Sequence, residues 1–263
     1  MGMATVAVYS ECDRGARHVR MADEAVAIGG NAPGESYLRI DRLVEAARLT
    51  GADGVHPGYG FLAENEDFAS ACADAGLTFI GPTPQAIALM GSKTAARAVA
   101  IDAGAPVVPG TTEALGAEVP DAEVARIAAD VGYPIMLKAV AGGGGKGMRV
   151  VAGPADLSSA LRAARSEAGA SFGDSSVYLE RRIVRPRHIE VQLLADHHGT
   201  VLPFVERECS IQRRHQKVIE ESPSPVVDAR LRRRLASAAA SIAARVGYTN
   251  ADRKSTRLNS SHT

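Results

Sequence analysis

The sequence predicts an α/β unit followed by an α+β unit, the first of which is like half of a Rossmann domain. In the first third of the chain, short apolar runs alternate with helical patterns, which is typical of βαβ units and a parallel sheet. Further along, alternating apolar and polar residues with glycine-containing turns indicate antiparallel hairpins. We expect the first unit at residues 1–84, the second at 85–250, and a foreign or disordered tail at 251–263, where Leu258 is the one large apolar residue after Asp252.

Apolar periodicity defines the elements of the first unit. A helix is expected at 40–51, because its apolar residues recur at i, i+3, i+4 and i+7 and Gly51 provides a stop. A second helix is expected at 65–76, ending at Gly76. β-Rich runs predict short strands around these helices, at residues 5–9, 24–28, 54–56 and 77–81.

The second unit is expected to contain both helices and hairpins. Ser92 can cap a helix that ends at Gly104, and Leu235, Ala239 and Ile242 mark the apolar stripe of a helix at 228–247. Other helices are expected at 121–132 and 156–168, and strands at 133–140, 148–153, 176–183, 187–196 and 199–208. In the strand at 187–196, one face is expected to pack, and the polar face with His188 and Glu190 to be available.

Composition excludes several classes of function. The 30 basic and 30 acidic residues balance, so no general attraction to nucleic acid or to an anionic membrane is expected. Cys12, Cys72 and Cys209 form no CxxC pair, which indicates a reducing compartment. No apolar run approaches the roughly 20 residues that span a bilayer, and the first residues lack a signal-peptide pattern. We therefore expect a cytoplasmic protein that binds neither nucleic acid nor membrane.

The glycine-rich run KAVAGGGGKGMRVV, residues 138–151, is the most informative motif. Apolar residues flank it on both sides, which argues against a flexible linker. Its GxGxxG pattern is followed by a strand and not by a helix, and Lys146 is followed by glycine and not by serine or threonine, so neither dinucleotide nor Walker A loops fit. A hairpin with a glycine tip remains. Its backbone N–H groups can approach a phosphate closely, with Lys138 on the preceding strand.

Five strings occurring in this order resemble biotin carboxylase, the ATP-grasp component of biotin-dependent carboxylases. They are HPGYGFLAEN (56–65), MGSK (90–93), LKAVAGGGGKGMRVV (137–151), RPRHIEVQ (185–192) and ERECSIQRRHQKVIEESPSP (206–225). The resemblance covers about residues 5–248. It implies a Rossmann-like pre-ATP-grasp half-domain without its first strand, followed by a truncated ATP-grasp domain.

The resemblance implies a ligase reaction. ATP phosphorylates bicarbonate to carboxyphosphate, which breaks down to carbon dioxide and phosphate, and N1 of biotin captures the carbon dioxide. The implied cofactors are ATP, Mg²⁺ or Mn²⁺, and biotin on a separate carrier. The implied partners are bicarbonate, a biotin carboxyl carrier protein or domain, a subunit with carboxyltransferase activity, and a second copy in a homodimer. The final acceptor of an acyl-CoA carboxylase is chosen by another domain.

The resemblance also implies roles for individual residues. Lys217 matches the group that holds bicarbonate, and Tyr59 lies in the motif expected near the biotin ring. The residues that match nucleotide contacts are Lys93, Lys138, Gly144, Gly145, Glu180, Arg181, Arg182, Ile183, His188 and His215. Without these motifs, a lone lysine would be interpreted as a solvated surface charge, and His188 as a strand histidine with satisfied hydrogen bonds. Cys209 would be interpreted as a small buried residue, and a proton-relay role with Lys217 is an alternative.

The family's metal-binding carboxylates are expected beyond about Asn250, so no metal ligand is predicted in this chain, and the chain alone is expected to be inactive. Glu220 and Glu221 are not assigned as ligands because adjacent strand residues face opposite ways. Alternative functions are another ATP-grasp ligase of the carbamoyl-phosphate synthetase kind, or a nucleotide-binding module without catalysis. A dinucleotide-binding oxidoreductase would need a glycine fingerprint after the strand at 5–9, and SECDRGARH contains none.

Overall fold

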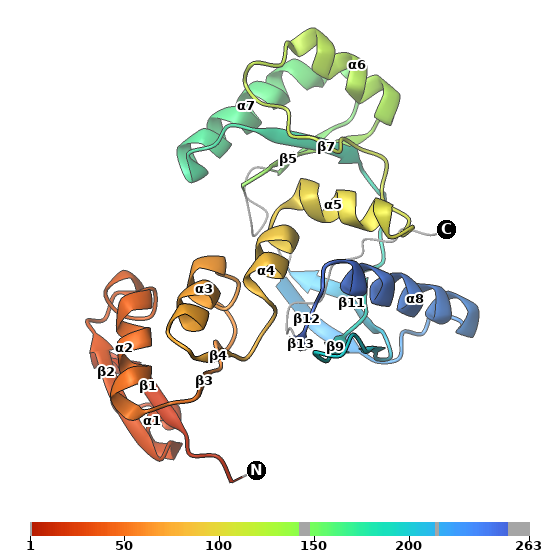
Figure 1. Ribbon diagram of the computed structural model, residues 1–263. Helices are drawn as coiled ribbons and strands as arrows, with labels where there is room; N and C mark the ends of the chain where they lie inside the picture. Colours follow the sequence, from red (N-terminus) through yellow and green to blue (C-terminus); the bar gives the residue numbers. More distant parts are fainter. Residues whose placement is uncertain (1, 142–147, 214–215, 252–263) are drawn as a thin grey trace. The chain divides into compact units, whose positions relative to one another are not determined.

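A computed structural model describes residues 2–141, 148–213 and 216–251 (Figure 1). The chain divides into two compact units: the first contains the described residues up to Ala88 together with 248–251, and the second those from Leu89 to Gly247. The division after Ala88 lies four residues beyond the expected boundary at 84. The domain limits given above stay a prediction.

The first unit is built from parallel strand pairs and helices, as the sequence predicts. Strand β1 (Val6–Ser10) pairs with β2 (Glu24–Gly29), and β3 (Gly54–Val55) pairs with β4 (Thr78–Phe79). The helices are α1 (Arg17–Met21), α2 (Ile40–Thr50) and α3 (Glu66–Asp74), and single 3-10 turns lie at Glu11–Asp13 and Pro33–Glu35. Gly51 ends α2 in the left-handed conformation (φ 63°), which glycine adopts without steric cost. Helix α4 (Pro84–Gly91) crosses the division between the units.

The core of the first unit lies between α2, α3 and the strands β3 and β4. Its buried members are Ala47, Leu62, Phe68, Cys72 and Leu77. Asn65 caps α3, since its side-chain oxygen accepts a hydrogen bond from the Phe68 N–H at 2.7 Å. Because Leu62 is buried in this core, it anchors the HPGYGFLAEN segment just before α3 begins.

An antiparallel sheet with the strand order β6–β5–β7 forms the first part of the second unit. The three strands are β5 (Ile135–Ala139), β6 (Met148–Val151) and β7 (Val177–Arg181). Helices α6 (Asp121–Val131) and α7 (Pro154–Phe172) pack on it (Figure 1). Ile135, Leu137 and Leu179 are completely buried in this core. The antiparallel pairing of β5 and β6 agrees with the predicted hairpin, whose tip at 142–147 lies outside the described residues.

A second sheet, ordered β12–β11–β8, contains Lys217, and its strand β8 begins directly after His188. Its strands are β8 (Ile189–Glu190), β11 (Arg207–Arg213) and β12 (Gln216–Glu221). Strands β9 (Leu193–Ala195) and β10 (Val201–Pro203) form a hairpin, and β13 (Asn250–Ala251) is the last strand described. Helix α8 (Ala229–Arg245), capped by Asp228, buries Leu235, Ala239 and Ile242 as predicted, partly against α5 (Lys93–Asp102).

Two predicted strands of this part are wrong in extent. Residues 187–196 do not form one strand, because the pairing ends at Glu190 and resumes at Leu193. Likewise, the strand expected at 199–208 is interrupted after Pro203, which cannot donate a ladder hydrogen bond. The predicted turn does occur: Gly199 has φ 91°, and the Asp196 N–H donates to the Thr200 carbonyl at 3.0 Å.

Among the described residues, none of the helices has the length and apolar character needed to cross a membrane.

The segment around Gly110 lines the outer edge of β7. The Arg181 N–H donates to the Pro109 carbonyl at 2.7 Å, and the Thr111 N–H donates to the Leu179 carbonyl at 2.8 Å. A Cβ atom at Gly110 would lie 2.5 Å from the Leu179 carbonyl oxygen and 2.8 Å from the Glu180 Cα. Because both atoms belong to the backbone, a side chain here would push the segment away from β7.

We expect Gly110→Ala to lower the free energy of unfolding by about 1–3 kcal/mol, the usual cost of overpacking a fitted contact. Gly91→Ala is the matched control, because a Cβ there would meet no described atom within 4 Å. It should be neutral or slightly stabilising, since alanine favours the helix. Urea unfolding monitored by circular dichroism measures both variants, and equal midpoints would contradict the close contact.

Candidate functional site

A lysine and a glutamate meet on one face of the β6–β5–β7 sheet. Lys138 of β5 is paired in register with Tyr178 of β7, so Glu180 lies one diagonal step along the neighbouring strand. The Lys138 ammonium forms an ion pair with the Glu180 carboxylate, and it lies 5.7 Å from the centre of the Tyr178 ring. Both partners of the ion pair are mostly buried, with side-chain exposures of 16% and 17%.

Lys93 reaches the same place from the beginning of α5. Its ammonium donates a hydrogen bond to the carbonyl of Ala139, the residue after Lys138, at 3.0 Å. Burial, and then the proximity of the Lys138 ammonium, lower the pKa of Lys93, while Glu180 acts in the opposite direction. Two lysines that are 45 positions apart in the sequence are thus brought together. Their role as phosphate-binding groups stays a prediction.

The segment Glu180–Ile183 leaves the end of β7. The Arg181 N–H donates to Pro109, and the Arg182 N–H donates to the Pro134 carbonyl at 2.8 Å. These two N–H donors are therefore engaged within the fold and are not available to an adenine ring. Ile183 is half-buried, which suits the expected apolar wall.

The second sheet is organised around Glu190, contrary to the sequence-based expectation that its side chain would be available. Glu190 is 1% exposed. Its carboxylate accepts a hydrogen bond from Arg207 Nε at 2.7 Å and forms an ion pair with the Lys217 ammonium. A buried carboxylate needs such partners, because desolvation of an unpaired charge costs several kcal/mol. The polar face of the predicted strand is therefore filled by ion pairs.

His188 is fixed by its neighbours on β11. Its backbone N–H donates to Ser210 Oγ at 2.8 Å, and its ring Nδ1 lies 3.0 Å from Gln212 Nε2, which also donates to the Cys209 carbonyl. The other ring nitrogen lies 3.7 Å from the Glu190 carboxylate. His188 and Lys217, predicted for the nucleotide and for bicarbonate, are thus both in contact with Glu190.

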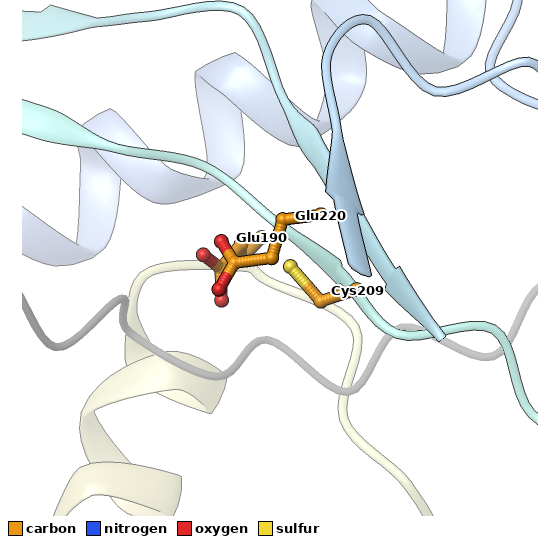
Figure 2. A group of neighbouring side chains, drawn as sticks. All are labelled: Glu190, Cys209 and Glu220. Atoms are coloured by element: carbon orange, nitrogen blue, oxygen red, sulfur yellow. The ribbon is translucent and has the colours of Figure 1, made fainter. Parts of the chain in front are cut away.

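Figure 2 shows Glu190, Cys209 and Glu220 side by side, with ligand atoms that all lie within 4.8 Å of one another. This geometry could suggest a metal site, which the sequence did not predict. However, both carboxylates are already close to cations, since Arg207 Nε lies 3.6 Å from Glu220 and the Glu190 oxygens face Arg207 and Lys217. Mg²⁺ also prefers oxygen ligands to a thiol. The group does not fit Mg²⁺.

Cys209 is completely buried beside Lys217 and Glu190. Burial, and then the negative charge of Glu190, raise the pKa of the Cys209 thiol to about 11, although Lys217 acts in the opposite direction. The thiol is therefore protonated at neutral pH. This protonation state argues against a relay that begins from a Cys209 thiolate.

The other predicted site residues cannot be placed beside these groups. Gly144, Gly145 and His215 lie outside the described residues. Tyr59 belongs to the first unit, where its side chain is 76% exposed. Sequence reasoning named Glu190 only as an available polar side chain and did not single out Arg207 and Gln212, although all three belong to the strings that carried the resemblance.

Two family models match the chain in succession. The family described as "Biotin carboxylase, N-terminal domain" matches residues 1–87, and that described as "Carbamoyl-phosphate synthase L chain, ATP binding domain" matches residues 92–260.

Curated relatives match over 95% of the chain. A biotin carboxylase of Nostoc sp. is 51% identical over 251 residues, which are 56% of that protein. The alpha chain of mitochondrial methylcrotonoyl-CoA carboxylase from Oryza sativa is 51% identical over 252 residues, 34% of its length. The mitochondrial pyruvate carboxylase of Rattus norvegicus is 50% identical over 252 residues, 21% of its length. The chain thus spans about half the length of the curated relatives it matches, or less.

Solved structures of biotin carboxylases are similar in fold to this chain. A biotin carboxylase from Campylobacter jejuni, in a β,γ-ATP complex, has a TM-score of 0.90 and 46% identity, covering 95% of this chain and 56% of that one. The biotin carboxylase domain dimer of Hydrogenobacter thermophilus 2-oxoglutarate carboxylase has a TM-score of 0.88 and 44% identity, covering 95% and 54%. That structure contains MgADP, ADP and bicarbonate.

Thiol chemistry tests the burial of Cys209. Of the three free cysteines, Cys12 is exposed whereas Cys72 and Cys209 are buried. Because the accessible thiolate is the reactive form, we expect Ellman's reagent at pH 8 to titrate one thiol in the native chain and all three in urea. Cys12→Ser should remove the native reaction. A thiol that still reacts in the native Cys12→Ser,Cys72→Ser double variant would contradict the buried, protonated state of Cys209.

The ion pairs of Glu190 should matter for stability. We expect Glu190→Gln to lower the free energy of unfolding by about 2 kcal/mol, because Arg207 and Lys217 then lose the charge that compensates them. Glu123→Gln is the matched control, since Glu123 pairs with Arg126 on the exposed surface of α6. It should cause no measurable change. Chemical unfolding compares the two, and an equal effect of both substitutions would contradict the central position of Glu190.

Proposed function

This chain belongs to the biotin carboxylase family, and we propose that the complete protein carrying it is a ligase that carboxylates biotin with bicarbonate and ATP. In this proposal the chain supplies the N-terminal unit and the nucleotide-binding unit. The observation that carries the proposal is the convergence of Lys93 and Lys138 beside the glycine-rich hairpin. Two neighbouring ammonium groups, one with a pKa lowered by burial and by the other, form a place that a polyphosphate would stabilise.

The proposed roles follow from the charges. Lys93 and Lys138 bind phosphate oxygens of ATP, with Glu180 holding Lys138 in position through their ion pair. Lys217 binds bicarbonate, and Glu190 orients its ammonium. Because phosphoryl transfer depends mainly on positioning and on neutralising charge, fixed lysines are suited to bring the γ-phosphate and the bicarbonate oxygen together. Carboxyphosphate would then release carbon dioxide for N1 of biotin.

Divalent metal ions neutralise phosphate charge in phosphoryl transfer when they are bound. The described residues do not provide a fitting site, because the cluster Glu190, Cys209 and Glu220 is engaged by cations and includes a thiol. Glu190 instead holds the cations Lys217 and Arg207 in fixed positions, and Glu220 lies near Arg207.

Further features of the proposal come from the relatives. We propose a biotin carrier and a carboxyltransferase as partners, and a homodimer like that of the Hydrogenobacter domain. From its motif alone, Tyr59 is proposed to lie near biotin. Three cysteines without a disulfide support a cytoplasmic location. A ligase of the carbamoyl-phosphate synthetase kind shares the second family model, but the match of residues 1–87 to the biotin carboxylase N-terminal family favours biotin as the acceptor.

The test is steady-state ADP release by the complete protein with ATP, bicarbonate and free biotin. We expect biotin to stimulate ADP release, and Lys217→Gln to raise KM for bicarbonate roughly tenfold or more, the usual loss for a charged hydrogen bond. KM for ATP should change less than about twofold in that variant, because Lys217 is assigned to the second substrate. Lys138→Gln should show the reverse pattern.

Arg162→Gln is the matched control, since Arg162 is an exposed cation on α7 of the same unit. It should leave every constant unchanged. ADP release that depends on bicarbonate but not on biotin would contradict the biotin assignment. Binding of ATP without any turnover would favour the nucleotide-binding module instead.

A further inference from the structure

The loop that carries Tyr59 has an unusual backbone. It connects β3 to α3, and Gly58, Gly60 and Phe61 all have positive φ angles, of 69°, 78° and 42°. Glycine accepts such angles, but a bulky residue such as Phe61 rarely does. A conformation of this kind persists where its surroundings determine it. The contacts of Phe61 therefore show what holds the loop.

Phe61 stacks on Tyr37, which precedes α2. Their ring centres are 5.0 Å apart and the rings are inclined by 22°. Phe61 remains 61% exposed, so this stacking is not part of the buried core. The core contact of the loop is made by the next residue, Leu62, which is 8% exposed. Leu62 fixes the end of the loop near α3, whereas the Phe61 ring sets the direction of the part before it.

Tyr37 is itself fixed at the carboxyl end of β1. Its hydroxyl donates to the Asp13 carboxylate at 2.6 Å and accepts from the Ser10 N–H at 3.0 Å. The Ser10 hydroxyl donates to the same Asp13 oxygen at 2.8 Å, and Ser10 is completely buried. The hydrogen bond from Tyr37 lowers the pKa of Asp13, so this acceptor is charged at neutral pH. Charged acceptors make the stronger hydrogen bonds.

We propose that Tyr37 is a positioning residue for biotin, acting through Phe61 on the loop that carries Tyr59. This inference rests on the proposed function, in which Tyr59 lies near the biotin ring. In this proposal Tyr37 acts through Phe61 and not by contact with the substrate. Its hydroxyl is held by β1 and its ring holds Phe61, so that a rigid series of contacts runs from the sheet to the loop. A loop fixed in this way presents Tyr59 without an ordering cost on binding.

Hydrogen–deuterium exchange of this chain tests the first half of the proposal. Tyr37→Phe removes the hydroxyl and keeps the ring, whereas Phe61→Leu removes the stacked ring and keeps apolar volume. Each should accelerate exchange of residues 57–63 roughly tenfold, while exchange in the second unit stays unchanged and serves as the reference. The double variant should add little to either single one, because both act through one series of contacts. Tyr9→Phe, which removes a hydroxyl on β1 itself, is the matched control and should leave the exchange of residues 57–63 unchanged.

Kinetics of the complete protein test the second half. Tyr37→Phe should raise KM for free biotin about three- to tenfold and leave KM for ATP within about twofold, a split that general destabilisation would not produce. Unchanged exchange at 57–63 would overturn the positioning role. Faster exchange with an unchanged KM for biotin would overturn the link to biotin. If the wild-type protein shows no biotin-stimulated ADP release, the proposed function fails, and the exchange data alone then decide whether Tyr37 holds the loop.

Discussion

The register between β5 and β7 is the constraint on which the candidate nucleotide site depends. Ile135, Leu137 and Ala139 alternate with polar or half-buried residues, and they enter the core beneath α6 and α7. This alternation places Lys138 on the opposite face, one diagonal step from Glu180. A slip by one residue would bury the lysine in the apolar layer and expose Leu137. The hydrophobic effect therefore fixes the position of the cation.

The second sheet buries a charged group, the carboxylate of Glu190. Burying the Glu190 carboxylate is unfavourable unless its charge and its hydrogen-bond capacity are satisfied. Arg207 and Lys217 satisfy both, and in return they lose the freedom of long surface side chains. A lysine held in this way is well placed for a small anion, but its charge is partly offset. Any anion that binds Lys217 must therefore compete with Glu190 for the ammonium.

Local periodicity predicted the elements whose burial is decided within a few residues. The helical stripe of α8, the stop at Gly51 and the short parallel strands of the first unit follow from such patterns. The burial of Glu190 could not be predicted in this way, because its partners lie 17 and 27 residues further along the chain. A polar residue on an alternating strand is normally read as exposed. This expectation was wrong for Glu190, because Arg207 and Lys217 compensate the cost of burying its charge.

The candidate nucleotide residues show a further limit of reasoning from single residues. Neither Lys93 nor Lys138 differs in the sequence from a solvated surface lysine, and only the motifs singled them out. In the fold they form a like-charged pair in which burial and mutual repulsion disfavour the charged form of Lys93. Glu180 offsets part of this cost, since it pairs with Lys138. A bound polyanion would relieve the repulsion between the two ammonium groups. A cluster of like charges with a perturbed pKa is a candidate binding site on physical grounds.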